Sequence, residues 1–339
     1  MSSRSKNLFK MKTTSLLLSA IALCFVLSAQ GQEKPSLTLA KTIPLPDIRG
    51  GFNHMSADAE QHRLFATATT RRTLEIIDLK SSKPWRSLAG EGTAAALFVP
   101  EFNQLYVTRH QNVCIYDGNT FDLLTSVDLQ CGLDELGCNP DAKQLYVGCM
   151  TSNYTAIAIL SLPDGKQIGK IKLPAKPQGF AVEQKGKRIY VNLTSLKQIA
   201  VLDREKQKLI EVWPLKDAAA NYPLALDETN HRLFVGCRQS AQLVVFNTTT
   251  GKPVASVAIS ADTDDLAYDA AHKRIYVACG EGFLDVIEQH DADHYQLSDR
   301  IPAKPGSRNG CFAPGANEFY LAIPQRGSQA AEIQVYQAR

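Results

Sequence analysis

The sequence has none of the short motifs that mark the common catalytic and metal-binding sites. It contains no G-x-S-x-G, no H-E-x-x-H and no Walker phosphate loop, so nothing supports a nucleophile-elbow hydrolase, a zinc protease of that type or a P-loop nucleotidase. It has no C-x-x-C either, so neither a zinc ribbon nor a redox pair is predicted. After residue 31, no apolar run approaches the ~20 residues that a membrane-spanning helix needs.

A large excess of charge is also missing. The chain has 37 Lys and Arg against 34 Asp and Glu. Four of the basic residues, and no acidic one, lie in the first 31 positions, so 33 basic residues face 34 acidic ones in the remainder. A nearly neutral chain has no global field to hold nucleic acid or an anionic membrane, although a local patch could still do so.

The first 31 residues have the pattern of a secretory signal peptide. Arg4, Lys6, Lys10 and Lys12 precede an apolar run at 16–27, and small residues follow at 28–31. A basic head, a short apolar middle and a small-residue exit are typical of a cleaved signal. We therefore expect residues 1–31 to be removed, residues 32–339 to form one domain, and the mature protein to be a soluble one, periplasmic or secreted, without a membrane span.

One seven-residue stretch recurs seven times along the chain. Each copy has a polar pair, an apolar residue, an aromatic and a small or β-branched run, as in residues 273–279, which predicts a strand entered from a tight turn. The third residues of the copies are Leu64, Leu105, Leu145, Ile189, Leu233, Ile275 and Phe319. Repeats of about 40 to 45 residues built of strands and turns indicate the blades of a β-propeller.

The repeats predict an all-β, seven-bladed propeller with four antiparallel strands, A to D, in each blade. In the sixth repeat we expect strands at 264–268, 274–279, 283–288 and 295–301. The last repeat ends after its C strand at 332–337, whereas residues 36–45 have the character of a D strand. We therefore expect the N-terminal strand to pair with the C-terminal blade and close the ring, which leaves no open sheet edge at the seam.

Seven cysteines follow the predicted signal peptide. Cys149, Cys237 and Cys279 occupy the same place in three different blades, and Cys131 and Cys138 are about 20 Å apart along one extended strand. Disulfide geometry needs Cα atoms closer than this. We expect all seven to be unpaired thiols that fill the interfaces between sheets.

The B strands resemble those of the YVTN-type β-propeller repeat family. Tyr190-Val191-Asn192 and Tyr106-Val107-Thr108 carry the likeness, which extends over residues 32–339. The resemblance implies a seven-bladed ring in an exported bacterial protein. It implies no single activity, since some relatives are thought to bind nucleic acid and other seven-bladed rings are lyases or lactonases.

The antiparallel order predicts where a site would lie. The D-to-A and B-to-C connections share one face, here called the upper face, where residues opening the A strands surround the central channel. Guanidinium groups on this face would grip a carboxylate or phosphate around a polar centre. The predicted ligand-binding residues are Asn53, His54, Arg72, Arg109, Asp134, Glu135, Gln178, Tyr222, Arg238, Asp264, Asp265 and Arg308.

Three functions stay open at this point. The first is a non-enzymatic binding propeller, expected to be a monomer, that captures an anionic small molecule, a glycan or a partner protein. The second is a metal-assisted lyase or lactonase at the channel mouth, with His54, Asp134 and Asp264 as candidate catalytic residues. No cofactor is predicted, but Asp264 and Asp265 are candidate ligands of a divalent cation. The third is a single-stranded nucleic-acid binder.

Overall fold

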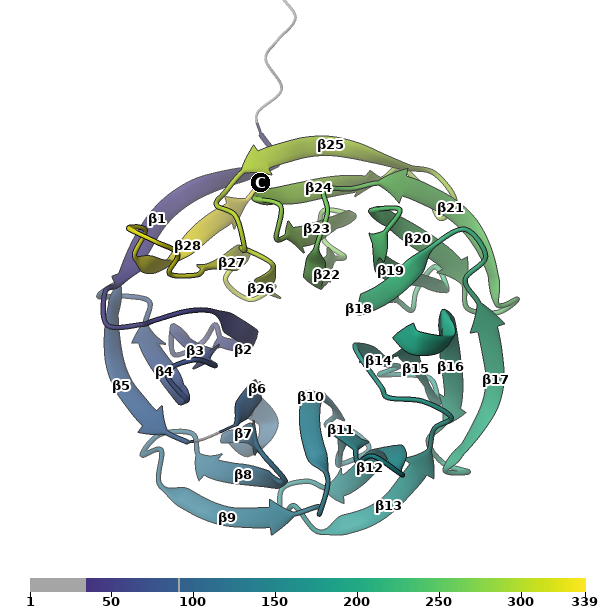
Figure 1. Ribbon diagram of the computed structural model, residues 1–339, viewed down its shortest axis with the longest axis horizontal. Coiled ribbons are helices and arrows are strands. Elements are labelled where there is room, and N and C mark those ends of the chain that lie inside the picture. Colours follow the sequence, from purple (N-terminus) through teal and green to yellow (C-terminus); the bar gives the residue numbers. More distant parts are fainter. Residues whose placement is uncertain (1–34, 91) are drawn as a thin grey trace, which may run out of the picture. The chain divides into compact units, whose positions relative to one another are not determined.

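The computed structural model describes residues 35–90 and 92–339. Within them, the chain forms seven four-stranded antiparallel sheets arranged as the blades of a ring (Figure 1). The predicted all-β, seven-bladed propeller is confirmed. The predicted signal peptide at 1–31 lies outside the described residues.

The strands follow one another from the channel outward in each blade. Blade 1 contains β2 (Phe52–Asp58), β3 (Arg63–Ala68), β4 (Thr73–Asp78) and β5 (Lys83–Ala89), and blade 2 contains β6 (Thr93–Val99), β7 (Gln104–Arg109), β8 (Asn112–Asp117) and β9 (Leu123–Asp128). Blade 3 contains β10 (Gly132–Asn139), β11 (Gln144–Met150), β12 (Thr155–Ser161) and β13 (Gln167–Lys172), and blade 4 contains β14 (Phe180–Val182), β15 (Arg188–Leu193), β16 (Gln198–Asp203) and β17 (Lys208–Pro214). Blade 5 contains β18 (Ala219–Asp227), β19 (Arg232–Gln239), β20 (Gln242–Asn247) and β21 (Lys252–Ala258), and blade 6 contains β22 (Thr263–Asp269), β23 (Arg274–Cys279), β24 (Phe283–Gln289) and β25 (Tyr295–Pro302). Blade 7 contains β26 (Asn309–Ala313), β27 (Glu318–Ile323), β28 (Ala331–Ala338) and β1 (Leu37–Leu45), and two 3-10 turns, η1 (Pro100–Phe102) and η2 (Thr194–Leu196), lie in blades 2 and 4.

The ring closes in blade 7, as the sequence predicts. The N-terminal strand β1 pairs antiparallel with β28, from Leu37 opposite Ala338 to Leu45 opposite Ala331. Ile43 and Leu45 are buried in the core cluster between blades 7 and 1. The seam therefore combines backbone pairing with apolar packing.

The repeated stretch forms the buried B strand of every blade. Its aromatic side chains share one register, and each is fully buried: Phe65, Tyr106, Tyr146, Tyr190, Phe234, Tyr276 and Tyr320. These strands are apolar on both faces because each is covered by a neighbouring blade on either side. The outer D strands are mostly exposed, as β9 and β13 illustrate.

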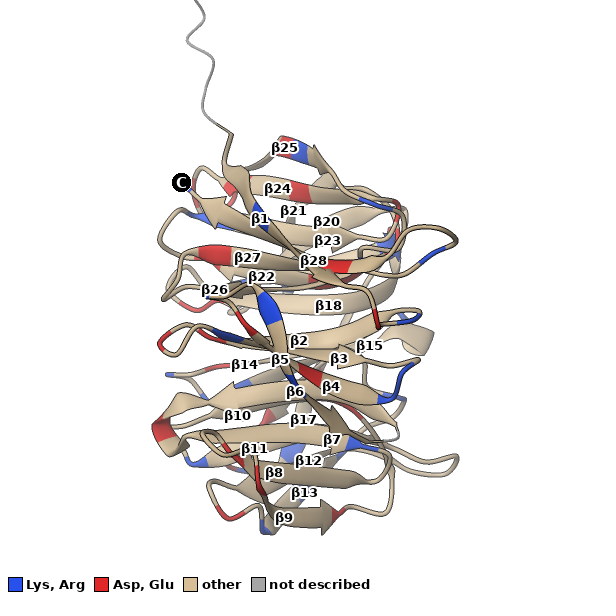
Figure 2. Ribbon diagram, turned by 90° about the vertical axis from the view of Figure 1, so that its left-hand side faces the viewer, with Lys and Arg blue, Asp and Glu red and all other residues tan. Residues whose placement is uncertain are grey.

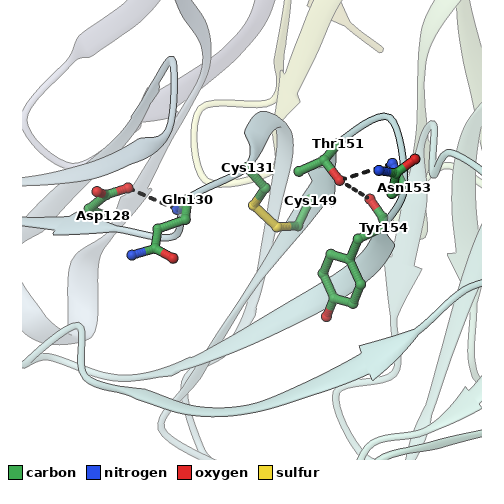
Figure 3. Close-up of a disulfide and its surroundings, with 7 residues drawn as sticks. All are labelled: Asp128, Gln130, Cys131, Cys149, Thr151, Asn153 and Tyr154. Carbon is green, nitrogen blue, oxygen red and sulfur yellow. Dashed lines mark hydrogen bonds between the residues drawn. A yellow bond between two sulfur atoms is a disulfide. The ribbon is translucent and has the colours of Figure 1, made fainter.

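The expectation that all cysteines are unpaired is wrong for two of them. Cys131 and Cys149 form a disulfide, with their Cα atoms 5.7 Å apart (Figure 3). Cys131 immediately precedes β10, and the register of β10 with β11 sets Leu133 opposite Cys149. The disulfide thus joins neighbouring segments of one blade. A comparison of cysteines at equivalent positions in different blades does not consider this pairing. Cys114, Cys138, Cys237, Cys279 and Cys311 are unpaired.

None of the helices within the described residues is long and apolar enough to cross a membrane.

Candidate functional site

The residues that line the channel come from a repeated irregularity in the innermost strands. Register shifts occur after Phe52, Thr93, Leu133, Asn221 and Thr263, at the start of β2, β6, β10, β18 and β22. A bulge bends its strand and changes the direction of its side chains. Four of these five irregularities, all but that of β6, contain residues of the predicted site: Asn53, His54, Asp134, Glu135, Tyr222 and Asp264.

Side chains of the neighbouring B strands hold these bulges in place. The hydroxyl Oγ1 of Thr108 on β7 donates to the carbonyl of Asp134 at 3.2 Å, and Nδ2 of Asn192 on β15 donates to the carbonyl of Tyr222 at 2.8 Å. Both side chains are fully buried and occupy the same position in their repeats. Each satisfies a bulge carbonyl of the next blade, which fixes the backbone that carries the channel residues.

The channel brings His54 and Asp265 together. Nδ1 of His54, on blade 1, lies 2.7 Å from Oδ1 of Asp265, on blade 6, so the pair spans the inner strand of blade 7. The other oxygen of Asp265, Oδ2, accepts from the backbone N–H of Gly310 at 3.0 Å and from Nδ2 of Asn309 at 3.2 Å. The side chains of His54 and Asp265 keep only 20% and 14% of their exposure. Asp265 is therefore a preorganised acceptor that orients the imidazole.

Glu135 adds a third titratable group to the channel. Its Oε2 accepts from the backbone N–H of Phe180 at 3.1 Å. Burial, partly offset by His54 and reinforced by the Asp265 and Asp134 carboxylates, raises the pKa of Glu135 to about 8. For His54, burial favours the neutral imidazole, but the nearby carboxylates, led by Asp265, outweigh it and raise its pKa well above the ordinary value. At neutral pH the arrangement thus favours an imidazolium beside a carboxylate and a protonated carboxylic acid.

Asp264 points into a network of arginines. It contacts Nη2 of Arg238, and Nε of Arg308 lies 3.5 Å from its Oδ2. Arg238 also donates from Nε to the carbonyl of Thr263 at 2.7 Å, and its guanidinium lies 3.7 Å from the ring centroid of Tyr222. Burial and Asp265 raise the pKa of Asp264, while His54 and the two arginines oppose that shift. Arg238 and Arg308 therefore neutralise protein carboxylates around the channel mouth.

The other predicted residues are Asp134, Gln178, Arg109, Arg72 and Asn53. Oδ2 of Asp134 lies 3.9 Å from Nζ of Lys176, and the backbone N–H of Gln178 donates to the carbonyl of Asn192 at 3.0 Å. Arg109 lies with its guanidinium 5.4 Å from the ring centroid of Tyr116, and Arg72 is exposed in the loop between β3 and β4. Asn53 is half-buried on β2 beside His54.

A cavity of about 340 Å³ opens on the upper face between blades 7 and 1. Arg308 and Arg326 line it together with Asn309 and Gln325, and none of its lining residues is acidic. Gly306, at φ +91°, lets the guanidinium of Arg326 approach closely, since a Cβ there would lie 2.7 Å from Cζ. We call this space the upper pocket. Arg326 lies in the loop between β27 and β28. Its position in the sequence does not single it out, because the pocket that it lines forms only where the fold brings loops of blades 7 and 1 together.

The described residues contain no group of three or more His, Cys, Asp or Glu side chains arranged to hold a metal ion. The two candidate ligands of a divalent cation, Asp264 and Asp265, are engaged by arginines, by His54 and by Asn309.

Comparison with known proteins supports the fold more than the function. No family model matches the chain. The chain is similar to the uncharacterized protein YncE of Salmonella typhimurium (strain LT2), with 29% identity over 98 residues, and to YncE of Salmonella typhi, with 28% identity over 98 residues. Each match spans 28% of this chain and 28% of the relative.

Solved structures give the wider likeness. A chain of Kuenenia stuttgartiensis hydrazine synthase superposes with a TM-score of 0.72 at 15% identity, over 81% of this chain and 93% of that chain. A chain of a mitotic checkpoint complex superposes with a TM-score of 0.74 at 18% identity, over 95% of this chain and 99% of that chain. At these identities the likeness establishes the propeller fold alone.

Proposed function

We propose that this protein is an exported, non-enzymatic binding propeller that captures a small anionic molecule in the upper pocket. The observation that carries the proposal is a cavity of about 340 Å³ lined by Arg308 and Arg326 and by no acidic residue. Guanidinium groups bind carboxylates and phosphates through paired N–H donors. A propeller is well suited to this role because loops from different blades converge on one face.

The two arginines contribute differently. Arg308 is held by Asp262, with Nη1 3.2 Å from Oδ2, and by Asp264, so it is positioned before a ligand arrives. Arg326 has no ion pair with any described residue, and its guanidinium borders the pocket beside Gly306. Arg326 is therefore the residue we expect to supply most of the charge that an anion would meet.

The upper pocket adjoins the channel cluster through Asn309. This residue lines the pocket and also donates to Asp265, which in turn bonds His54. Asn309 and Asp265 would thus separate an anion bound by Arg308 and Arg326 from the imidazole of His54.

The disulfide supports the exported part of the proposal. Cys131 and Cys149 are paired within blade 3, and disulfides form and persist mainly in oxidising compartments. This agrees with the basic and then apolar pattern of residues 1–31.

Isothermal titration of the purified protein tests the binding proposal. Inorganic phosphate, citrate and glucuronate serve as anionic probes, and glucose serves as the neutral one. We expect saturable binding of at least one anion, weakened by salt and reduced about tenfold or more in Arg326→Ala, because a charge-assisted hydrogen bond contributes about 1.5–3 kcal/mol. Lys216→Ala is the matched control, since Lys216 is an exposed base on the same face outside the upper pocket. Equal affinity of Arg326→Ala and the parent protein would contradict the proposal.

Acid–base catalysis at the channel mouth is a second candidate, favoured by the 2.7 Å contact of His54 with Asp265. The imidazole is oriented by a carboxylate, and Glu135 supplies a carboxylic acid whose pKa is raised to about 8. Such a pair could move a proton in a lyase or lactonase reaction. Turnover of lactone or uronic-acid substrates by the parent protein, abolished in His54→Gln, would favour this candidate over binding alone.

A further inference from the structure

The seam between blades 7 and 1 holds a small cavity on the outer wall of the ring. It has a volume of about 200 Å³ and lies where β5 runs beside β1, on the side of the ring that Figure 2 shows. Its lining residues come from the end of β1 and the connection to β2, from the loop before β4, and from β4 and β5. We call this space the outer cavity. It shares no lining residue with the upper pocket.

The alternation of side chains along β4 decides which of them face the outer cavity. Leu74 and Ile76 pack in the core between blades 1 and 2, whereas Ile77 packs in the core between blades 7 and 1. Successive side chains of a strand point to opposite faces. Glu75 therefore faces the seam between blades 7 and 1, together with its cross-strand neighbour Ser87.

Two long side chains that border the outer cavity direct their end groups elsewhere. The guanidinium of Arg86 donates from Nη1 to the carbonyl of Thr120. The indole of Trp85 packs edge-on against Phe121, with 5.5 Å between the ring centroids. Thr120 and Phe121 belong to blade 2, and neither of them lines the outer cavity. The charge of Arg86 and the indole of Trp85 are therefore not part of the site.

Glu75 is a buried carboxylate without a basic partner. It is only 3% exposed. Its Oε1 accepts from the hydroxyl of Thr73 and its Oε2 from the hydroxyl of Ser87, and no basic side chain of the described residues lies within ion-pair distance of it. Each carboxylate oxygen can accept a further hydrogen bond. A buried carboxylate is costly unless its remaining acceptor capacity and its charge are satisfied.

Blade 6 shows what the fold supplies to an acid at this position. Asp285 occupies the same place on β24 as Glu75 does on β4. Its two oxygens accept from the backbone N–H and the hydroxyl of Ser260, in the connection between blades 5 and 6, and Nε of Arg300 lies 3.1 Å from its Oδ1. Glu75 has no counterpart of these contacts, and it faces a cavity instead. A ligand that completes the site must therefore bring N–H donors and a positive charge.

The remaining lining residues restrict what else the ligand carries. Arg71 and Asp47 line the outer cavity and are exposed, so they lie at its mouth, and apolar surface comes from Leu45, Ile48 and Pro84. With the guanidinium of Arg86 directed elsewhere, two carboxylates face one guanidinium, an excess that favours a cationic group. Arg71 in turn suits a carboxylate, because a guanidinium binds it through paired N–H donors. A small molecule with an ammonium group, a carboxylate and an apolar part fits all three features.

We propose that the outer cavity binds a small α-amino acid with an apolar side chain. Its ammonium group donates to the spare acceptor sites of Glu75 and supplies the charge that this buried carboxylate lacks. Its carboxylate accepts from the guanidinium of Arg71, and its side chain packs on Ile48 and Pro84. A simple amine or a simple carboxylate would satisfy only one of the two ionic contacts.

Isothermal titration with matched ligands tests this proposal. The probes are alanine, valine and leucine, and the one that binds best is compared with its N-acetyl derivative, which lacks the ammonium, and with the amine that lacks only the carboxylate. We expect saturable binding of the amino acid, weaker binding of the amine and no binding of the N-acetyl derivative. Glu75→Gln should weaken binding of the amino acid about tenfold or more, because a charge-assisted hydrogen bond is lost. Arg71→Ala should weaken it about tenfold but leave the affinity for the amine unchanged.

Two sets of controls separate loss of the site from loss of the fold. Glutamine is compatible with this position, because Gln334 occupies the equivalent place in blade 7, and urea unfolding of Glu75→Gln checks that the variant is folded. Arg71→Ala changes only an exposed side chain, so it tests the site even if Glu75→Gln does not fold. Lys216→Ala removes an exposed base outside the outer cavity, and Arg326→Ala removes a cation of the upper pocket; both should bind the amino acid like the parent protein.

Three results would overturn the proposal. The first is the absence of saturable binding by any of the three amino acids at millimolar concentration. The second is equal binding of the N-acetyl derivative, which would show that no ammonium group is recognised. The third is an unchanged affinity for the amino acid in Arg71→Ala or in folded Glu75→Gln.

Discussion

Nδ1 of His54 lies 2.7 Å from Oδ1 of Asp265, although 211 positions separate the two residues in the chain. The contact joins the first and sixth blades across the inner strand of the seventh. The contact fixes the orientation of the imidazole in the channel. It also contributes to the free energy of unfolding, and this contribution depends on pH.

Replacing His54 by Gln should destabilise the protein more at acidic than at alkaline pH. The carboxylates around His54 raise its pKa well above the ordinary value despite burial. A raised histidine pKa stabilises the folded state fully below the unfolded pKa of about 6.5, and this contribution is lost as pH rises through the folded pKa. Urea unfolding of the parent and His54→Gln at about pH 6 and about pH 10 should therefore show a smaller difference at the higher pH. A difference that does not change with pH would contradict the prediction.

Glu135→Gln should stabilise the protein at alkaline pH. The pKa of Glu135 is raised to about 8, chiefly by burial, so the folded state holds a proton that the unfolded state releases near pH 4.5. Stability is lost as pH rises from the unfolded value to the folded one, and a glutamine avoids this loss while its carbonyl can still accept from Phe180. Above about pH 8, we expect the free energy of unfolding of Glu135→Gln, measured in urea, to be about 2 kcal/mol higher than that of the parent. Equal stability at about pH 9 would show that Glu135 ionises at its ordinary pKa.

Removing the disulfide should lower the free energy of unfolding. The Cys131–Cys149 bond closes a loop with a sequence separation of 18, and cross-links of this size contribute about 2–4 kcal/mol. The double variant Cys131→Ser, Cys149→Ala should lose this amount in urea unfolding under non-reducing conditions. Adding a reductant should destabilise the parent but leave the double variant unchanged. Mass spectrometry of non-reduced peptides provides an independent check, and a free thiol at Cys149 would refute the pairing.

Shortening Ile43 should weaken the closure of the ring. Ile43 is fully buried at the junction of blades 7 and 1, whereas Leu39 on the same strand is 50% exposed. Ile43→Ala should cost about 2–5 kcal/mol of unfolding free energy, because it leaves a cavity at the seam. The matched change Leu39→Ala should cost less than about 0.5 kcal/mol. Similar losses for the two variants would indicate that β1 is not packed against the core.

Much of the fold follows from the repeat, since the copies fix both the number and the order of the strands. The B strand expected at 274–279 has those bounds, and the closing strand expected at 36–45 is β1. Periodicity is informative here because the aromatic of each copy must be buried between two sheets. Bulge positions could not be derived in this way, since they depend on register between strands, and the pairing of Cys131 with Cys149 depends on that register.

The candidate site could be predicted only in part. The antiparallel order correctly brings the D-to-A and B-to-C loops to one face, as the lining of the upper pocket shows. The residues opening the A strands include the His54–Asp265 pair, but their spacing does not say which of them meet. The ion pair of Arg238 with Asp264 does not follow from the sequence either, because side-chain pairing around the channel depends on rotamers as well as on position in the repeat.

The pairing of β1 with β28 also imposes an order on biosynthesis. Strand β1 has no hydrogen-bonding partner until β28 has been made, so the ring cannot be sealed before all seven blades have been synthesised. A ring that closes through its first and last strands is therefore completed in a single late step.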